Sequence, residues 1–279
     1  MIPQRNLSLL SNRLAKSGDR RIPETVLERD YCLAWFLVAL SQEGLGQWLA
    51  FKGGTALKRC YFGDYRFSED LDFTLTQETP FETIQKELDP VFARVRSASG
   101  IVFRYAREDR HGHTNSHTFY FGYEGPLPAT AAGKEVKVDI TIREKIIFPL
   151  ASRSVLRGYE EYADLPDGTN LRTYALDEIA VEKAVALMDR ARNEPRDLYD
   201  IWHLTEQSHI ELEHLKGAVE EKLAFRGKKL DDVRDELSAK EARLKKLWDT
   251  RLSAQMASLP KFDDVYRSVR RAFRQSGLS

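Results

Sequence analysis

Cysteine and long apolar runs are scarce in this sequence. Only two of the 279 residues are cysteines, Cys32 and Cys60, and their positions show no metal-type spacing, which suggests a reducing compartment. The longest apolar run, residues 32–40, is far too short to span a bilayer and predicts a buried helix. The amino terminus lacks a cationic start followed by an apolar core. We therefore expect a cytoplasmic protein with no signal peptide and no membrane partner.

The chain also lacks a net charge. Its 43 Lys and Arg residues balance 43 Asp and Glu residues, so no overall field draws it onto nucleic acid. Charged residues make up 31% and hydrophobic residues 42%, which is typical of a globular protein with a core. A local basic patch is compatible with this balance. Arg226, Lys228 and Lys229 form either an RNA-facing patch or part of a solvated helical surface.

The first half of the chain alternates helical and strand patterns. The helical patterns cover residues 24–41 and 81–97. The strand patterns cover residues 48–51, 71–75, 100–106, 117–125 and 135–142.

From about residue 150 the pattern changes to helical periods. Asp177 is a candidate N-cap for a helix through Arg190, and Pro195 stands near the first turn of another helix. Gly227 predicts a break in the charged helical stretch that follows. We predict an α+β protein, with a mixed-sheet core and amino-terminal helices in residues 1–150 and a helical domain in residues 151–279.

Three aspartates on strand patterns suggest phosphoryl chemistry. Asp70 and Asp72 project from one face of a strand, about 6–7 Å apart at the backbone. Asp139 occupies the polar face of another strand whose alternate residues are aliphatic. Carboxylate oxygens suit hard cations, and three such groups on one sheet surface are what two-metal phosphoryl transfer needs. The alternative is that these aspartates are simply the polar, outward residues of alternating strands.

A glycine pair precedes the acidic strand. Gly53 and Gly54 end a strand and open a helix, so their N–H groups either bind an anion or only form a turn. The P-loop pattern is absent. Arg66 and Ser68 stand just before the acidic strand and are either phosphate ligands or ordinary surface residues.

Charged residues also fall on apolar helix faces in the second half. Lys183 shares a face with Ile179 and Leu187, so its side chain either reaches outward to solvent or is directed at an anion. Asp197 and Asp200 lie on a buried stripe and need a partner. That partner is either a metal or a cation among Lys183, Arg192 and Arg196.

Three histidines lie close together in the sequence, at positions 111, 113 and 117. They suggest zinc only weakly, because they fall in a loop pattern without the helix-spaced pair of known zinc enzymes. A loop that merely contains histidines is the alternative interpretation.

In this order, "GGT…RFSEDLDF", "VKVDI", "YALDEIAVEKAVAL" and "RDLYDIWHL" resemble the nucleotidyltransferase AbiEii/AbiGii toxin family, which includes the mycobacterial MenT toxins. The match runs from about residue 24 to 210, and the preceding "LERDYCLAWFLVALS" is similar to the lead-in helix of that family. The resemblance implies the DNA polymerase β-like nucleotidyltransferase fold. One departure is the longer separation between the glycines and Asp70 than in compact relatives.

The resemblance also implies roles for individual residues. Gly53, Gly54, Thr55, Arg66 and Ser68 would hold the nucleotide triphosphate. Asp70 and Asp72 would bind Mg²⁺, with Asp139 as the third acidic position. Lys183 would contact the nucleotide phosphates, and either Asp197 or Asp200 would complete the fourth motif.

The expected function is that of a toxin in a toxin–antitoxin or phage-defence system. It would be an Mg²⁺-dependent enzyme that transfers NMP from an NTP to RNA, with the 3′ end of tRNA as the acceptor and a cognate antitoxin as partner. Two alternatives stay open from the residues. One is a nucleotidyltransferase that acts on a small molecule or a protein side chain, and the other is a non-catalytic nucleotide-binding module.

Overall fold

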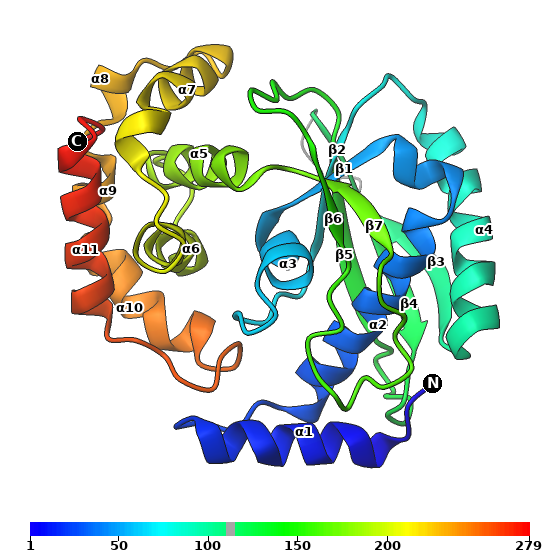
Figure 1. The fold of residues 1–279 in the computed structure, drawn as a ribbon. Coiled ribbons are helices and arrows are strands. Elements are labelled where there is room, and N and C mark those ends of the chain that lie inside the picture. Colours follow the sequence, from blue (N-terminus) through cyan, green and yellow to red (C-terminus); the bar gives the residue numbers. More distant parts are fainter. Residues whose placement is uncertain (110–114) are drawn as a thin grey trace. The chain divides into compact units, whose positions relative to one another are not determined.

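The computed structural model describes residues 1–109 and 115–279. These residues form two compact units (Figure 1). The first comprises Met1–Glu144, Leu150–Tyr174 and Gln255–Ala257, and the second comprises Lys145–Pro149, Ala175–Ala254 and Ser258–Ser279. Residues 150–174 therefore belong to the unit that contains the sheet, whereas the sequence pattern predicts that the helical domain begins at about residue 150.

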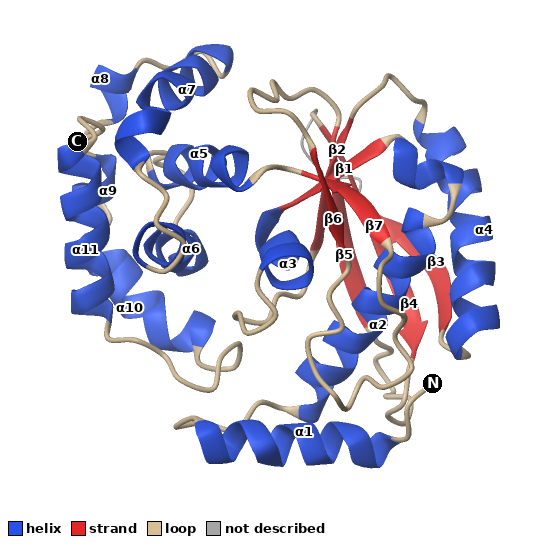
Figure 2. Cartoon of the chain, viewed as in Figure 1, coloured by secondary structure: helices blue, strands red, loops and turns tan. Residues whose placement is uncertain are grey.

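A mixed β-sheet forms the centre of the first unit (Figure 2). The order of its described strands is β3-β4-β5-β2-β1-β7-β6. These strands are β1 Leu49–Lys52, β2 Leu71–Leu75, β3 Val102–Glu108, β4 Ser116–Glu124, β5 Glu135–Thr141, β6 Ala151–Ser154 and β7 Asn170–Thr173. β2 pairs with β5 and β1 with β7 in parallel, and the other pairs are antiparallel.

The helices of the first unit are α1 Gln4–Ser17, α2 Glu24–Ser41, α3 Gly53–Ala56 and α4 Phe81–Ser99. A short 3₁₀ turn covers Gly44–Gln47, and a π-helical turn, Leu57–Tyr61, continues α3. Residues 30–40 of α2 are all buried, as expected of a helix that is apolar all round. α2 contacts α4 and β7, and α4 contacts β3, so these two helices supply the apolar layer of the core.

The alternation of the strands explains which sheet face the helices cover. In β5, Val136, Val138 and Ile140 are buried, while Lys137 and Asp139 between them are partly exposed. Each strand residue faces the side opposite to its neighbour, so one side of the sheet meets the core and the other carries polar groups. The predicted strands of the first half are confirmed.

The second unit is helical. Its helices are α5 Leu176–Leu187, α6 Pro195–Glu206, α7 Leu212–Phe225, α8 Leu230–Val233, α9 Glu236–Ala239, α10 Glu241–Leu252 and α11 Phe262–Gln275. α6 packs against α5, α10 and α11, and α5 also packs against α7. The predicted α+β class, a mixed sheet with flanking helices followed by a mostly helical carboxyl-terminal half, is confirmed.

The start of α5 differs from the prediction, and the start of α6 confirms it. Asp177 is not an N-cap, because Ala175 holds that position and α5 already starts at Leu176. Asp177 lies in the first turn instead, where its negative charge favours the positive end of the helix dipole. Pro195 is the first residue of α6, as predicted.

The described helices include none that is both long enough and apolar enough to cross a membrane.

Candidate active site

The glycine pair lies directly against the acidic strand. Gly53 follows the last residue of β1 and has a φ of +78°, a conformation that side chains rarely adopt. A Cβ atom at Gly53 would overlap Asp72 Oδ2 and lie 3.1 Å from Asp72 Cγ. The turn and the carboxylate therefore form one local structure, although they are separated in the sequence.

Two further contacts tie the glycine turn to the residues before β2. The Thr55 hydroxyl donates a hydrogen bond of 2.5 Å to the carbonyl oxygen of Asp70. A Cβ at Gly54 would lie 2.5 Å from Arg66 Nη2. Arg66 and Ser68 are themselves buried, with 2% and 7% of their surface exposed. The long segment between the glycines and Asp70 thus folds back, and it brings Arg66 onto the turn.

The sheet register brings two of the three aspartates together. Asp72 on β2 and Asp139 on β5 are direct partners in a parallel pair. Residues in register on neighbouring strands share a face of the sheet. Asp70 lies one residue before β2 begins and is half-buried. Asp139 keeps 28% of its side chain exposed and has Lys137 Nζ at 3.8 Å from its Oδ2.

The positions of Asp72 and Asp139 suit a cation that binds together with the phosphates of a substrate. Within residues 1–109 and 115–279, no three His, Cys, Asp or Glu side chains form a group that could hold a metal ion. Magnesium, however, is commonly bound by one or two carboxylates together with substrate phosphates. The oxygen donors of Asp72 and Asp139 fit such a hard cation.

Lys52 is a candidate site residue that the sequence patterns missed. It is the last residue of β1 and the register partner of Asp72, so Lys52, Asp72 and Asp139 form one row across three strands. Its Nζ donates to Thr141 Oγ1 at 3.1 Å and lies 5.5 Å from the centre of the Tyr174 ring. The available signal was a lysine at the end of an apolar strand, immediately before the two glycines.

The other predicted site residues form an ion-pair cluster in the second unit. Lys183 Nζ lies 2.7 Å from Asp197 Oδ1 and 2.7 Å from Asp200 Oδ2. Arg192 Nε lies 2.5 Å from Asp197 Oδ2. Both aspartates are buried, and 9% of Lys183 is exposed. Lys183 and Arg192 are thus cationic partners of these aspartates.

The cluster shifts the ionisation of Asp197. Burial alone would raise its pKa, but the charges of Lys183 and Arg192 outweigh burial and lower the pKa to about 2. Because this pKa lies below the ordinary 3.8, the ionised carboxylate stabilises the fold above about pH 4. That contribution is lost as the pH falls through about 2.

The remaining candidates have other surroundings. His111 and His113 lie outside the described residues. His117 stacks on Phe81 with ring centres 4.7 Å apart, and burial lowers its pKa. Arg226 Nη2 lies 3.9 Å from an oxygen of Glu182, and Lys228 Nζ lies 3.4 Å from one of Asp189. Lys229 is exposed.

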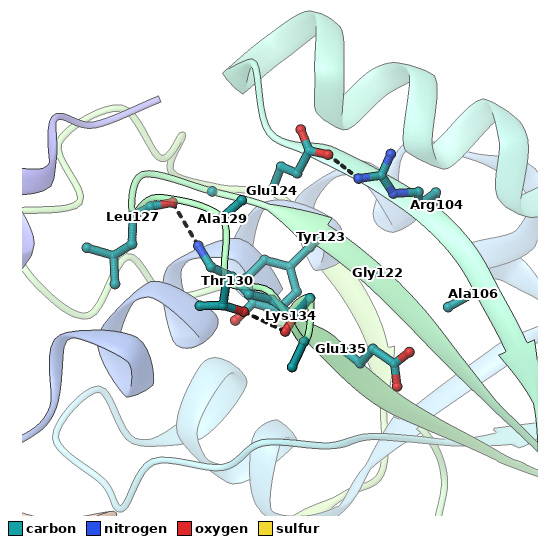
Figure 3. A pocket seen from close by; sticks show the side chains of 13 residues that line it. Arg104, Ala106, Gly122, Tyr123, Glu124, Leu127, Ala129, Thr130, Lys134 and Glu135 are labelled. Atoms are coloured by element: carbon teal, nitrogen blue, oxygen red, sulfur yellow. Dashed lines mark hydrogen bonds and ion pairs between the residues drawn. The ribbon is translucent and has the colours of Figure 1, made fainter.

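A cavity of about 470 Å³ lies against β3, β4 and the segment that joins β4 to β5 (Figure 3). Arg104, Glu124, Lys134 and Glu135 are among its lining residues, and none of the predicted site residues lines it. The row of Lys52 and the carboxylates, rather than this cavity, therefore marks the candidate active site.

Comparison with known proteins gives the family. JHP933 from Helicobacter pylori has a similar structure, with a TM-score of 0.55 and 19% identity over 91% of this chain and 93% of that chain. MenT4, a nucleotidyltransferase toxin of Mycobacterium tuberculosis, also has a TM-score of 0.55 and 19% identity, over 96% and 89% of the two chains. No curated protein sequence matches the chain.

The model of the nucleotidyltransferase AbiEii toxin family, described as belonging to type IV toxin–antitoxin systems, matches residues 35–272. This match covers most of the chain and confirms the resemblance found in the sequence. The family implies an NTP substrate and an antitoxin partner. The chain belongs to the nucleotidyltransferase AbiEii toxin family, and it is a nucleotidyltransferase.

Proposed function

We propose that the enzyme transfers a nucleoside monophosphate from an NTP to RNA, at the 3′ end of tRNA, in an Mg²⁺-dependent reaction in the cytoplasm. An acceptor hydroxyl oxygen forms a bond to the α-phosphorus, and the bond from that phosphorus to the bridging oxygen of the β-phosphate breaks. The pyrophosphate leaves and the hydroxyl proton passes to solvent. The observation that carries the proposal is the pairing of Asp72 with Asp139 beside the Gly53 turn.

In this proposal, residues of the first unit bind the metal ion and the phosphates. Asp72 and Asp139 would hold Mg²⁺ together with phosphate oxygens of the NTP, with Asp70 as a further ligand of the substrate-bound ion. When bound, the ion neutralises charge on the phosphates and activates the attacking hydroxyl. Lys52, in register with Asp72, would add a positive charge for the phosphates. The backbone at Gly53 approaches the carboxylates without a side chain in the way.

A second group of residues would orient the triphosphate. Gly54, Thr55, Arg66 and Ser68 would line its path, since Arg66 is held against Gly54 and Thr55 is bonded to the backbone of Asp70. Lys183 would contact phosphate oxygens. Asp197 and Asp200 would orient the Lys183 ammonium through their ion pairs.

The test is an incubation of the protein with each α-labelled NTP, Mg²⁺ and total tRNA. We expect label in tRNA, at the 3′-terminal nucleotide after nuclease digestion, and none with Asp70→Asn or with the metal chelated. Label that appears in a small product or a protein band would favour another acceptor. Label transfer that survives Asp70→Asn would contradict the proposed site.

The toxin role has a separate test. Expression of the chain should arrest growth, and co-expression of the product of a neighbouring gene, as the candidate antitoxin, should relieve the arrest. Arrest that persists with Asp72→Asn would show that nucleotide transfer is not its cause.

Replacing Gly53 with alanine should damage the site more than the fold. The added Cβ would displace the Asp72 carboxylate, and a shift of about 1 Å near reacting groups lowers rates roughly 10²-fold. Gly100→Ala is the matched control, because Gly100 has a φ of +77° and no neighbouring atom within 4 Å of the added Cβ. Both variants should lose about 1–2 kcal/mol of unfolding free energy from backbone strain. Equal activities in the two variants would contradict the role of the Gly53 contact.

A further inference from the structure

The polar face of the sheet continues beyond Asp139 onto β4 and β3. Thr118 on β4 is the register partner of Asp139. The next row on the same face consists of Lys137 on β5, Tyr120 on β4 and Arg107 on β3, which pair in that order. Residues two apart on a strand face the same side. This second row, called here the Arg107–Tyr120–Lys137 row, therefore lies beside the proposed reaction centre.

A β-bulge places Arg107 in this row. The register of β3 and β4 shifts between Tyr105 and Arg107, so that Tyr105 pairs with Phe121 and Arg107 with Tyr120. Without the extra residue, Ala106 would oppose Tyr120 and Arg107 would face the other side. Bulges commonly redirect a side chain in this way near functional sites. The Arg107 guanidinium carbon lies 3.6 Å from the centre of the Tyr120 ring, which is a close stack.

The three side chains remain accessible in their positions. Arg107 is 53% exposed and pairs with Glu135 at 2.9 Å. Lys137 is 40% exposed, with its Nζ 3.8 Å from Asp139, and Tyr120 is half-buried. A planar cation, an aromatic ring and an ammonium group thus follow one another across three strands, next to a carboxylate of the proposed site.

We propose that the Arg107–Tyr120–Lys137 row binds the unpaired end of the RNA acceptor. Guanidinium planes and aromatic rings stack on exposed bases, and this contact tolerates different sequences. Lys137, between the stack and Asp139, binds the phosphate next to the reacting nucleotide, where its charge complements the RNA backbone. This inference rests on the proposed function, because it needs an RNA acceptor.

The test measures kinetics of label transfer to tRNA in four variants. The double variant Arg107→Ala/Tyr120→Ala should raise the KM for tRNA about 5-fold or more, since a base stack contributes about 1–3 kcal/mol. Its kcat should change less than about 3-fold, and its KM for NTP should stay at the wild-type value. Arg107→Lys should show much of the same defect, because it keeps the charge but loses the plane. Lys137→Gln should weaken the salt dependence of RNA binding by a slope of about 0.7.

Arg104→Ala is the control. Arg104 lies on the same strand, is 62% exposed and pairs with Glu124, as drawn in Figure 3. Its register partner is Gly122, one row farther from Asp139. We expect Arg104→Ala to keep the wild-type KM for tRNA, and melting curves of all variants should confirm that they are folded.

The outcomes separate this inference from the proposed function. If the wild-type protein labels no RNA, the RNA acceptor is wrong and the inference falls with it. If the wild type labels RNA, and the KM for tRNA of the double variant equals that of Arg104→Ala, the proposed function stands. The role of the Arg107–Tyr120–Lys137 row in RNA binding is then overturned. A raised KM for NTP with an unchanged KM for tRNA would also overturn it.

Discussion

Asp72→Asn is expected to lower the rate of nucleotide transfer by about 10³-fold or more while leaving the protein folded. Asp72 is the register partner of both Lys52 and Asp139 and touches the Gly53 turn, so its carboxylate stands at the centre of the candidate site. Losing one oxygen ligand of a catalytic cation removes several kcal/mol of transition-state stabilisation, and about 4 kcal/mol corresponds to 10³-fold. Single-turnover transfer of α-labelled NTP to tRNA measures the effect.

The stability of the same variant distinguishes a site residue from a structural one. Asp72 has the like charge of Asp139 on one neighbouring strand and the opposite charge of Lys52 on the other, and cross-strand charge pairs each contribute about 0.2–1 kcal/mol. These two effects oppose each other, so the unfolding free energy of Asp72→Asn should change by less than about 1 kcal/mol. The surface control Asp167→Asn, at a residue whose side chain is 75% exposed, should keep full activity. An Asp72→Asn variant that is inactive only because it unfolds would contradict this role.

The second large effect is expected for Lys183→Met. Removal of this lysine leaves the buried carboxylates of Asp197 and Asp200 without their shared cation. Breaking a buried ion pair on one side typically costs about 3–5 kcal/mol of unfolding free energy. Urea denaturation should show a loss of this size. The triple variant that adds Asp197→Asn and Asp200→Asn should recover most of it, because no unpaired charge then stays buried.

Activity of the stable triple variant decides what Lys183 does. If Lys183 contacts the nucleotide, the triple variant should remain at least about 10²-fold slower than wild type, as for loss of one charged group that stabilises the transition state. Recovery of wild-type activity would show that the cluster is only structural. Lys222 is the matched control, since it is also buried and pairs with Glu178 and Glu182 in the same unit. Lys222→Met should lose comparable stability without slowing the folded fraction.

Local patterns predicted the elements of the site well. Alternation identified β2 and β5, and thereby the polar face that holds Asp72 and Asp139. The apolar run at residues 32–40 identified the central helix α2. These features depend on periods of two or 3.6 residues, which are visible within a short window of sequence. The ordered motifs then gave the family, which the match over residues 35–272 confirms.

Local sequence patterns could not predict which strands pair with each other in the sheet. Which strand lies beside β2 depends on how the whole sheet packs, so the direct pairing of Asp72 with Asp139 and the position of Lys52 came only from the structure. The bulge that turns Arg107 toward Tyr120 is likewise a property of two paired strands. Short strands β6 and β7 lack a clear alternating pattern of their own, and tertiary pairing fixes them, β7 against β1 and β6 against β7.

The most direct test of the central claim follows both ends of the triphosphate in one reaction. With NTP labelled at the α-phosphate, the proposed site should place one label in RNA for each pyrophosphate released. With NTP labelled at the γ-phosphate, all released label should appear in pyrophosphate and none in RNA. Asp72→Asn should suppress both signals together. Label from the γ-phosphate in RNA, or pyrophosphate release without α-label in any acceptor, would contradict nucleotide transfer at the Asp72–Asp139 pair.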